Sequence, residues 1–317
     1  MYRLVSVILC CATLQGAHAQ GYPTRDLRLI IASAPGGNID LAARRIADGL
    51  VRRFGVRILF DYRPGASGAI ANDALIRAVP DGYTLLMTAG SYLTTAPHAR
   101  SGPDPLTLVT PVSIIATYPF MLAVHSGSPV DSLGGLVTLA KKRPGELTYG
   151  SSGAWSGQHL AGALLEKMAG VRMVHVPYRG TPAGVLDLLG GRLDALYLSP
   201  AVGKPYVDEG TMRPLITTGM LRSPLLPDTP TVAELGYPGY AVSGWVGLFV
   251  PVGVSPEIVR LLNSTVGDIL LDPQVQEAMR SQSEVFEQHS PAEALDRART
   301  EQQYYGALMR ELGVVPQ

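Results

Sequence analysis

Strand-like segments and helical patterns alternate between residues 27 and 90. Residues 27–33 (LRLIIAS) are apolar on both faces, as the central strands of buried parallel sheets are. Residues 38–54 carry an apolar side chain at every fourth position near their end, which marks one face of a helix. Two more strand-like segments, 57–63 and 83–90, enclose a second helical stretch. This β-α-β-α-β order predicts a parallel sheet.

The pattern restarts in the second half of the chain. Residues 146–151 are strand-like, and Leu160, Leu164 and Met168 then recur at helical spacing. Strand, helix and strand patterns continue to residue 199. Two similar halves predict an α/β protein with two lobes, whose first helices point their N-termini at a shared cleft, because ligands of open α/β sheets bind beyond the carboxyl ends of strands.

Two longer apolar segments, 110–127 and 243–253, flank the second unit. We expect both to be strands that carry the chain between the lobes, since a lobe inserted into another needs two crossings. Together the crossings make a hinge. Two further helical patterns, 255–271 and 291–312, are interpreted as structural, with Ser255 as the cap of the first.

The two glycine turns are candidate anion sites. Residues 34–38 (APGGN) precede a helix that we expect Asn38 to cap. Residues 151–159 (SSGAWSGQH) precede the other first helix and add three serine hydroxyls. Free N–H groups and the macrodipole at a helix N-terminus favour a carboxylate or a phosphate. Neither turn matches a phosphate-binding P-loop or a dinucleotide fingerprint, so no cofactor is expected.

Residues 1–19 have the pattern of a secretory signal: a positive start, a short apolar run and the small-x-small sequence AHA. Both cysteines, Cys10 and Cys11, lie inside this segment, so a chain cut after Ala19 contains no thiol. An exported protein without disulfides suits a bacterial periplasm. Lipoprotein anchoring at Cys10 is the alternative, although Leu9 stands where a small residue is expected.

The charges and histidines exclude several classes of partner. Lys+Arg and Asp+Glu are both 26, and no basic patch is visible, which argues against nucleic acid. No apolar run after the signal reaches the roughly 20 residues that span a bilayer. The five histidines beyond the signal are scattered, without the spacing of a metal site.

Ser152 and His159 raise a serine hydrolase as an alternative. A nucleophile elbow needs G-x-S-x-G, and residues 150–154 (GSSGA) lack its last glycine. His175 and His289 lie further along the chain, but neither has a motif around it. We interpret His159 as an early-helix residue that hydrogen-bonds to its own loop.

Residues 176–184 (VPYRGTPAG) end a strand and begin a helix. Tyr178 offers a hydroxyl to the cleft, and Arg179 offers a fork for a carboxylate. Arg179 also fits a solvent-facing or lobe-bridging role. Asp40 and Arg44 are spaced i, i+4, which predicts an ion pair on a helix face.

With these segments in order, the chain resembles the periplasmic solute receptors of tripartite tricarboxylate transporters, the Bug family. The likeness covers nearly the whole chain after the signal. It rests on PGGNIDLAAR, on DYRPGASGAIANDALIRAVPDGYTLL, on PGELTYGSSGAWSGQHLAGALLEKMAG and on VHVPYRGTPAGVLDLLGGRLDALY.

The resemblance implies a two-lobed periplasmic binding protein of type II, with two parallel or mixed sheets flanked by helices. One lobe would comprise residues 20–122 and 244–317, and the inserted lobe residues 123–243. The resemblance also implies a monomeric receptor, not an enzyme, that binds a small organic carboxylate and delivers it to membrane permease subunits. The alternative is a periplasmic sensor that docks to a membrane signalling protein.

In the family, the loops that match residues 34–38 and 151–156 pinch one carboxylate, often with ordered water. A second carboxylate would need another polar partner, for which Tyr178 and Arg179 are candidates. The residues expected at the ligand are Ser33, Ala34, Pro35, Gly36, Gly37, Asn38, Asp40, Ser91, Ser152, Gly153, Trp155, Ser156, His159, Tyr178, Arg179, Gly180 and Asp194.

Two positions depart from the family pattern. Many members have an aromatic residue where this chain has Ser33, and many have glycine where it has Trp155. One hypothesis is that Trp155 enters the cleft and packs on the ligand, because indole suits stacking on an apolar or aromatic acid. The alternative is that Trp155 packs outward on its loop.

Overall fold

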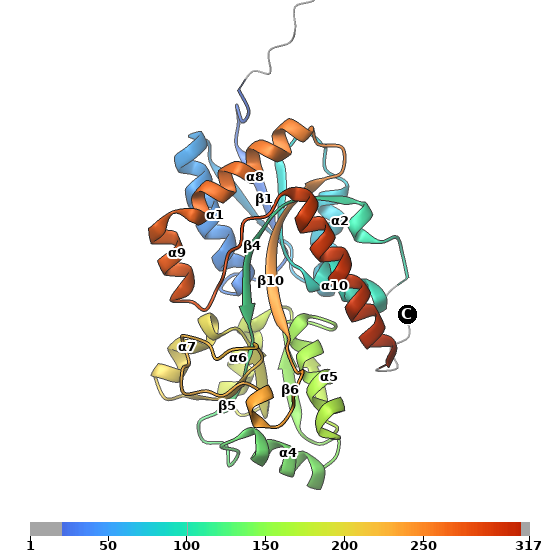
Figure 1. Ribbon diagram of the computed structural model, residues 1–317, viewed down its shortest axis with the longest axis vertical. Coiled ribbons are helices and arrows are strands. Elements are labelled where there is room, and N and C mark those ends of the chain that lie inside the picture. Colours follow the sequence, from blue (N-terminus) through green and yellow to red (C-terminus); the bar gives the residue numbers. More distant parts are fainter. Residues whose placement is uncertain (1–20, 100, 312–317) are drawn as a thin grey trace, which may run out of the picture.

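The computed structural model describes residues 21–99 and 101–311 (Figure 1). The expected signal segment and its cleavage site at Ala19 lie outside these residues. Within the described part of the chain, no helix is both long and apolar enough to cross a membrane.

The first sheet has five strands in the order β2-β1-β3-β10-β4. Strands β1, β2 and β3 pair in parallel, which confirms the predicted β-α-β-α-β unit. Strand β10 runs antiparallel to both β3 and β4. The bounds are β1 Leu27–Ile31, β2 Ile58–Tyr62, β3 Thr84–Ala89, β4 Val109–Pro119 and β10 Ser243–Pro251.

The helices around this sheet form with it what we call the first lobe (Figure 1). They are α1 Asn38–Phe54, α2 Ala69–Ile76, α3 Ser91–Thr94, α8 Pro256–Leu271, α9 Pro273–Arg280 and α10 Pro291–Glu311, with the 3-10 turns Ala66–Gly68, Ala96–Ala99 and Pro105–Thr107. Helices α8 and α10 both pack on β4. Ile30 and Ile31 are adjacent in β1 and both fully buried, so both faces of the sheet are covered, as the sequence predicted.

The second sheet, with its helices, forms the second lobe. Its order is β7-β6-β8-β5-β9; β6 is parallel to β7 and β8, and β5 is antiparallel to β8 and β9. The strands are β5 Met121–His125, β6 Thr148–Ser151, β7 Val174–Pro177, β8 Ala195–Leu198 and β9 Met212–Thr217. The helices are α4 Leu133–Lys142, α5 Gly157–Ala169, α6 Thr181–Leu189 and α7 Pro200–Asp208, with a 3-10 turn at Ala233–Leu235.

The chain crosses between the lobes at two places, as predicted. Phe120 alone separates β4 from β5, and the return path leads through Val242 into β10. Thr218 ties the two crossings together, because its hydroxyl accepts the Phe120 N–H at 2.8 Å and donates to the Val242 carbonyl at 2.6 Å. Figure 1 shows β4 and β10 side by side, with β4 running into the second lobe and β10 running back from it. The exact lobe boundaries stay a prediction.

One local prediction was wrong. Asn38 is the first residue of α1 and not its cap; the cap position is Gly37, in an extended conformation and without a side-chain hydrogen bond. The Asn38 side chain is engaged elsewhere, at Ser199. The helix predicted from the spacing of Leu160, Leu164 and Met168 is confirmed as α5, although Met168 near its end is 37% exposed.

Candidate functional site

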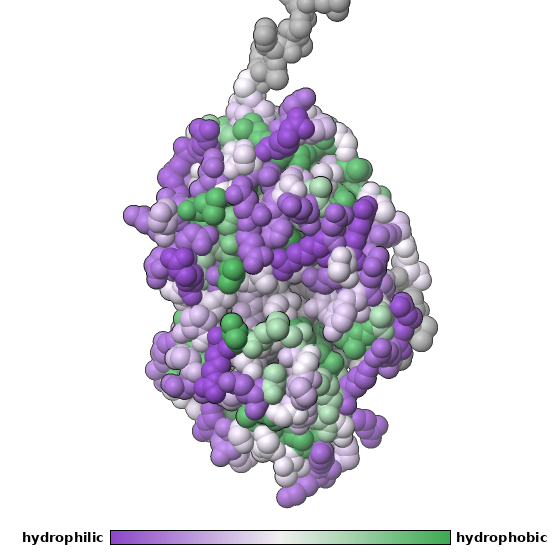
Figure 2. Space-filling model, in the orientation of Figure 1, coloured by the Kyte–Doolittle hydropathy of each residue, from purple (hydrophilic) through white to green (hydrophobic). Residues whose placement is uncertain are grey.

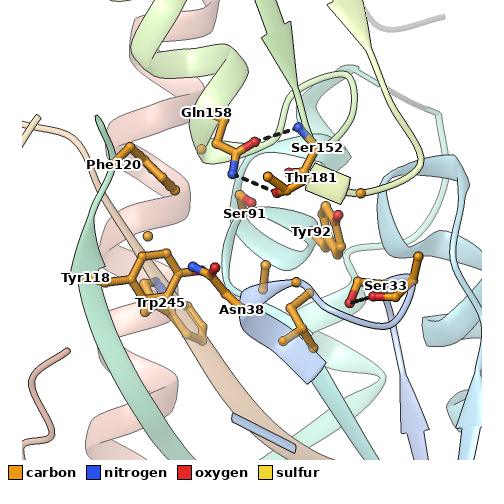
Figure 3. A pocket seen from close by; sticks show the side chains of 17 residues that line it. Ser33, Asn38, Ser91, Tyr92, Tyr118, Phe120, Ser152, Gln158, Thr181 and Trp245 are labelled. Atoms are coloured by element: carbon orange, nitrogen blue, oxygen red, sulfur yellow. Dashed lines mark hydrogen bonds between the residues drawn. The ribbon is translucent and has the colours of Figure 1, made fainter. Parts of the chain in front are cut away.

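A cavity of about 40 Å³ lies between the two lobes, and we call it the inner cavity (Figure 3). One water needs roughly 10–15 Å³ on the same measure, so the inner cavity holds a small group rather than a single water. Its lining comes from the carboxyl end of β1, from the starts of α1, α5 and α6, and from the crossing strands β4 and β10. Both lobes therefore contribute to one site, at the level where the surface is hollowed between them (Figure 2).

Two helices direct uncapped N-termini at the inner cavity. The cap positions of α1 and α6 are Gly37 and Gly180, and neither helix has a side-chain cap. In the part of the chain described, the N–H groups of Asn38 and Ile39 have no hydrogen-bond partner. Helix α5 differs, because the Ser156 hydroxyl accepts its third N–H at 3.3 Å. Free donors at a helix N-terminus and the macrodipole both favour an anion.

Gln158 organises the polar side of the inner cavity. Its carbonyl oxygen accepts the Ser152 N–H at 2.6 Å, and its amide nitrogen donates to the Thr181 hydroxyl at 3.4 Å (Figure 3). The 151–156 loop is thereby fixed to the start of α6. Ser33, at the opposite side, donates to the Ala34 carbonyl at 3.2 Å.

The turns of the two lobes face each other closely. A Cβ added to Gly180 would lie 3.6 Å from the Ala34 nitrogen, so the α6 turn abuts the β1–α1 turn. Ser199, the cap of α7, donates its hydroxyl proton to the Asn38 carboxamide oxygen at 2.5 Å, and both side chains are buried. This hydrogen bond joins the first turn of a first-lobe helix to the second lobe.

Aromatic rings form the remaining wall. Tyr118, Phe120 and Trp245 come from the crossing strands, and Tyr92 comes from α3 (Figure 3). Burial raises the pKa of Tyr92, against the effect of its hydrogen bond with Ser152, and burial likewise raises the pKa of Tyr118. These phenols therefore stay neutral around neutral pH.

Trp245 is fixed by two neighbours. A Cβ on Gly90 would lie 1.9 Å from Trp245 Cε2, so only glycine lets the indole lie against this backbone. On the far side, the indole N–H donates to Glu301 of α10 at 2.5 Å. The indole of Trp245 is therefore held between α10 and the Gly90 backbone.

No Lys, Arg, His, Asp or Glu is among the described residues that line the inner cavity. An anion held there would be bound by neutral donors, namely backbone N–H groups, hydroxyls and amides. Such donors are worth more in a desolvated cavity than in water.

A second cavity, of about 200 Å³, lies beside the first, and we call it the outer cavity. Tyr92 and Ser152 line both cavities. The rest of the outer wall includes Ala32, Gly153 and Arg179.

The structure sorts the seventeen predicted residues into three groups. The inner cavity is lined by Ser33, Ala34, Gly37, Asn38, Ser91, Ser152 and Gly180. The outer cavity is lined by Ser152, Gly153, Tyr178 and Arg179. Neither cavity is lined by Pro35, Gly36, Asp40, Trp155, Ser156, His159 or Asp194.

Asp40 lies beneath the first glycine turn. Its carboxylate accepts from the Gly36 N–H at 2.9 Å, from the Tyr62 hydroxyl at 2.6 Å and from Arg44 Nε at 3.1 Å, so the predicted ion pair is confirmed. Burial acts to raise the pKa of Asp40, but these three hydrogen bonds and the Arg44 charge lower it below its usual range. Gly36 has φ 85°, a conformation that favours glycine. Asp40 thus shapes the turn.

Trp155 packs on its own loop and helix, which is the alternative to a place in the cleft. Its ring lies 4.4 Å from the His159 ring, and His159 stacks on His175 with centroids 3.6 Å apart. His159 Nδ1 accepts the Trp155 N–H at 2.9 Å, which confirms that His159 bonds to its own loop. Burial, with the neighbouring His175, lowers the pKa of His159 to about 3, and burial lowers that of His175 to about 4.

The serine-histidine pair in the structure is not the one considered from the sequence. His175 Nε2 lies 2.7 Å from the hydroxyl oxygen of Ser151, which is fully buried. Ser152 lines the cavities but has no histidine partner among the described residues. Asp194 instead accepts from the Thr148 N–H and hydroxyl, and so joins two strands of the second sheet.

Sequence reasoning missed the aromatic wall, together with Gln158 and Thr181. The aromatics stand in segments that the sequence marked only as crossing strands. Gln158 is the second residue of α5 and Thr181 the first residue of α6, and each follows a glycine turn that the sequence analysis identified. Their position directly after such a turn is the sequence signal that could have identified Gln158 and Thr181 as lining residues.

Comparison with known proteins was consistent with this architecture. Residues 42–313 match the family described as tripartite tricarboxylate transporter family receptor. Protein BugT of Bordetella pertussis is 32% identical over 321 residues, covering 99% of this chain and 98% of BugT. A solved structure described as R. palustris Rpa4515 with adipate has a TM-score of 0.90 at 33% identity, covering 94% of this chain and all of that one.

A second solved structure is described as MatC (Rpa3494) from Rhodopseudomonas palustris with bound malate. It has a TM-score of 0.85 at 25% identity and covers 90% of this chain and 99% of its own. The sequence match spans most of this chain, and the two-sheet fold agrees with it. The chain belongs to the tripartite tricarboxylate transporter receptor family of periplasmic solute-binding proteins.

Proposed function

We propose that this protein is an exported receptor that binds one small organic carboxylate in the inner cavity and delivers it to the membrane subunits of a tripartite transporter. The observation that carries the proposal is a cavity without charged side chains, at which two helices present uncapped N-termini. Such a site suits a carboxylate bound by backbone N–H groups.

Binding couples to closure because the donors come from both lobes. Helix α1 belongs to the first lobe and α6 to the second, so a ligand that contacts both stabilises the closed arrangement. The free energy by which the ligand shifts the equilibrium toward the closed state equals the difference between its binding free energies to the closed and open states. Phe120 lines the cavity and also forms one crossing, so the hinge and the ligand share a residue.

The relatives support the chemical class of the ligand. Solved structures of the same fold are described with adipate and with malate, which are both carboxylates. We propose that this chain acts in the periplasm as a monomer, after cleavage at Ala19, and that it binds without chemical turnover. The ligand contacts would include Ser33, Asn38, Ser91, Ser152 and Gly180.

The proposal is tested by binding and by uptake. The purified chain lacking residues 1–19 is expected to be stabilised in a thermal-shift screen by some members of a panel of small carboxylates, and not by the corresponding amides. Deletion of the gene is expected to abolish uptake of the acid that binds most tightly. Uptake that stays intact would overturn the transport role, and a panel without any stabilising acid would overturn the carboxylate site.

A further inference from the structure

We propose that Glu301 of α10 is a positioning residue for ligand recognition: it does not line the inner cavity, but it sets the orientation of the Trp245 indole that does. This inference rests on the proposed carboxylate site in the inner cavity. It assigns a part in binding to an acid group that lies behind the cavity wall.

The Glu301 carboxylate holds two segments of this wall from behind. One oxygen accepts the Trp245 indole N–H at 2.5 Å, and the other accepts the Thr94 hydroxyl at 3.0 Å. Trp245 belongs to β10, whereas Thr94 ends α3, the short helix that brings Ser91 and Tyr92 to the inner cavity. A single side chain thus fixes both an aromatic ring and a hydroxyl-bearing turn of the site.

The indole N–H depends on this acceptor. Nε1 is the polar atom of the indole, and it can only donate a hydrogen bond. Among the described residues, Glu301 is its one hydrogen-bond partner. Trp245 is 2% exposed, and a buried donor without a partner is costly. An indole that lost Glu301 would therefore have to turn to find another acceptor.

The surroundings leave the ring little space to turn without changing the cavity. A Cβ on Gly90 would lie 1.9 Å from Trp245 Cε2, and the Gly90 N–H donates to the Trp245 carbonyl at 2.9 Å. The ring is thus bounded by backbone on this side. Because Trp245 lines the inner cavity, whose volume is only about 40 Å³, a turn of the indole alters the space that the ligand meets (Figure 3).

The site uses Glu301 as an acceptor and not as a charge. Burial raises the pKa of Glu301, against the effects of its hydrogen bonds from Trp245 and Thr94 and of the Arg297 charge. A negative charge behind the wall would repel an anion in the cavity. Glutamine keeps the acceptor without the charge: its oxygen accepts the indole N–H, and its amide can donate to Thr94, whose hydroxyl can donate to the Gly90 carbonyl instead, at 3.1 Å.

The test compares three substitutions of Glu301 on a Trp155→Phe background. Trp155 lines neither cavity, and its removal leaves Trp245 as the one tryptophan of the sequence. Glu301→Gln keeps the reach without the charge, Glu301→Asp keeps the charge without the reach, and Glu301→Leu keeps neither.

Gln302→Leu is the matched control on the same helix. The Gln302 amide donates to Asp104 at 2.9 Å and to the Leu93 carbonyl at 3.4 Å, so its loss loosens α10 without touching the indole. Gln302 does not line the inner cavity. The control therefore separates a loosened helix from a displaced Trp245.

Two quantities are measured for each variant. Isothermal titration calorimetry gives the dissociation constant of whichever of acetate, succinate, malate, adipate and benzoate the background protein binds most tightly. The fluorescence of Trp245 without ligand, with acrylamide as the quencher, reports the surroundings of the indole. Melting temperatures show which variants are folded.

Glu301→Gln is expected to bind the acid at least as tightly as the background protein and to keep its emission maximum. Glu301→Leu is expected to bind the acid at least about fivefold more weakly, because an unpaired indole N–H lowers the fraction of protein with the ring in the binding orientation. Its emission should shift to longer wavelength, with stronger quenching. Glu301→Asp should fall between, and Gln302→Leu should match the background protein in both measurements.

Three results would overturn the inference. Background affinity in Glu301→Leu, or in Glu301→Asp if the leucine variant does not fold, would show that the indole acceptor has no part in binding. An equally weak Glu301→Gln would show that the site needs the charge and not the acceptor. An equally weak Gln302→Leu would show that any loosening of α10 has the same effect. A background protein that binds none of the five acids would instead overturn the proposed function itself, and this inference with it.

Discussion

At the scale of single residues, the stacked pair His159 and His175 makes the second lobe sensitive to acid. Burial lowers the pKa of His159 to about 3 and that of His175 to about 4, so the folded protein keeps both rings neutral. The unfolded chain binds protons at these rings below about pH 6.5. The free energy of unfolding therefore falls as the pH drops from about 6.5 toward 4, by about 1.4 kcal/mol per pH unit and per ring.

His159→Gln is expected to reduce this slope, because one of the two buried rings is then absent. Glutamine still offers an oxygen to the Trp155 N–H. Urea unfolding between pH 7 and 4.5 measures the slope, and His125→Gln, a change outside the stack, is the control. Parallel curves for His159→Gln and the wild type would show that the stacked rings do not carry the pH dependence.

At the scale of elements, Asp40 joins the first turn of α1 to the glycine turn before it. Asp40→Asn removes the charge that receives the Gly36 and Tyr62 hydrogen bonds. We expect a loss of about 1–2 kcal/mol in the free energy of unfolding and weaker carboxylate binding, since bonds to a charged acceptor are the stronger ones. The effect is present above about pH 4 and vanishes as the pH falls through the lowered pKa of Asp40, where the wild-type carboxyl is itself protonated.

Asp48→Asn is the matched control, because Asp48 is exposed on the same helix. Chemical unfolding and calorimetric titration with one carboxylate measure the two effects. If Asp40→Asn were indistinguishable from Asp48→Asn in both, the carboxylate would have no part in shaping the turn.

The elements are also what sequence reasoning predicted best. The helical spacing of apolar residues identified α1, and the glycine after it identified the end of the helix. In the structure, this residue, Gly55, adopts the left-handed conformation at the C-cap. Helix α7 was missed, since Pro200 and Pro205 within nine residues mask its pattern. The wrong cap at Asn38 has a related cause: its side chain bonds Ser199, which is 161 positions away, and no local rule contains that partner.

At the scale of the whole molecule, the lobes are joined by a hydrogen bond that needs no ligand. Ser199→Gly removes the hydroxyl that reaches Asn38, while glycine remains acceptable as the cap of α7. We expect the open state to gain population, so that small-angle X-ray scattering gives a larger radius of gyration without ligand, and ligand affinity falls with the closed fraction.

Ser132→Gly is the control for this change, because Ser132 caps α4 in the same way at an exposed position. It removes a cap without touching the other lobe. Equal radii of gyration for Ser199→Gly, Ser132→Gly and the wild type would mean that the Asn38–Ser199 bond does not set the balance of open and closed states.

The cavity itself shows where prediction from sequence ends. The glycine turns were found because their chemistry is local. The wall of Tyr118, Phe120 and Trp245 was not, because it forms only when β4 and β10 pair and cross between the lobes. For Trp155 the partner is local, yet the sequence still did not decide its place. His159 is only four residues away, and the spacing alone did not show that Trp155 packs on this ring and not in the cleft.

The central claim is that backbone N–H groups at helix N-termini bind the carboxylate. Asn38→Pro and Asn38→Ala both remove the side chain, but only proline also removes the N–H at the first position of α1. Proline is tolerated there, and the extended Gly37, with φ −93° and ψ 175°, suits a following proline.

The decisive measurement is therefore the dissociation constant of one carboxylate for these two variants, by isothermal titration calorimetry. The melting temperatures of the two variants, measured without ligand, check that both are folded. Loss of a hydrogen bond to a charged group corresponds to about 1.5–3 kcal/mol, so Asn38→Pro should bind the acid at least about tenfold more weakly than Asn38→Ala. Equal dissociation constants in two folded variants would contradict the account.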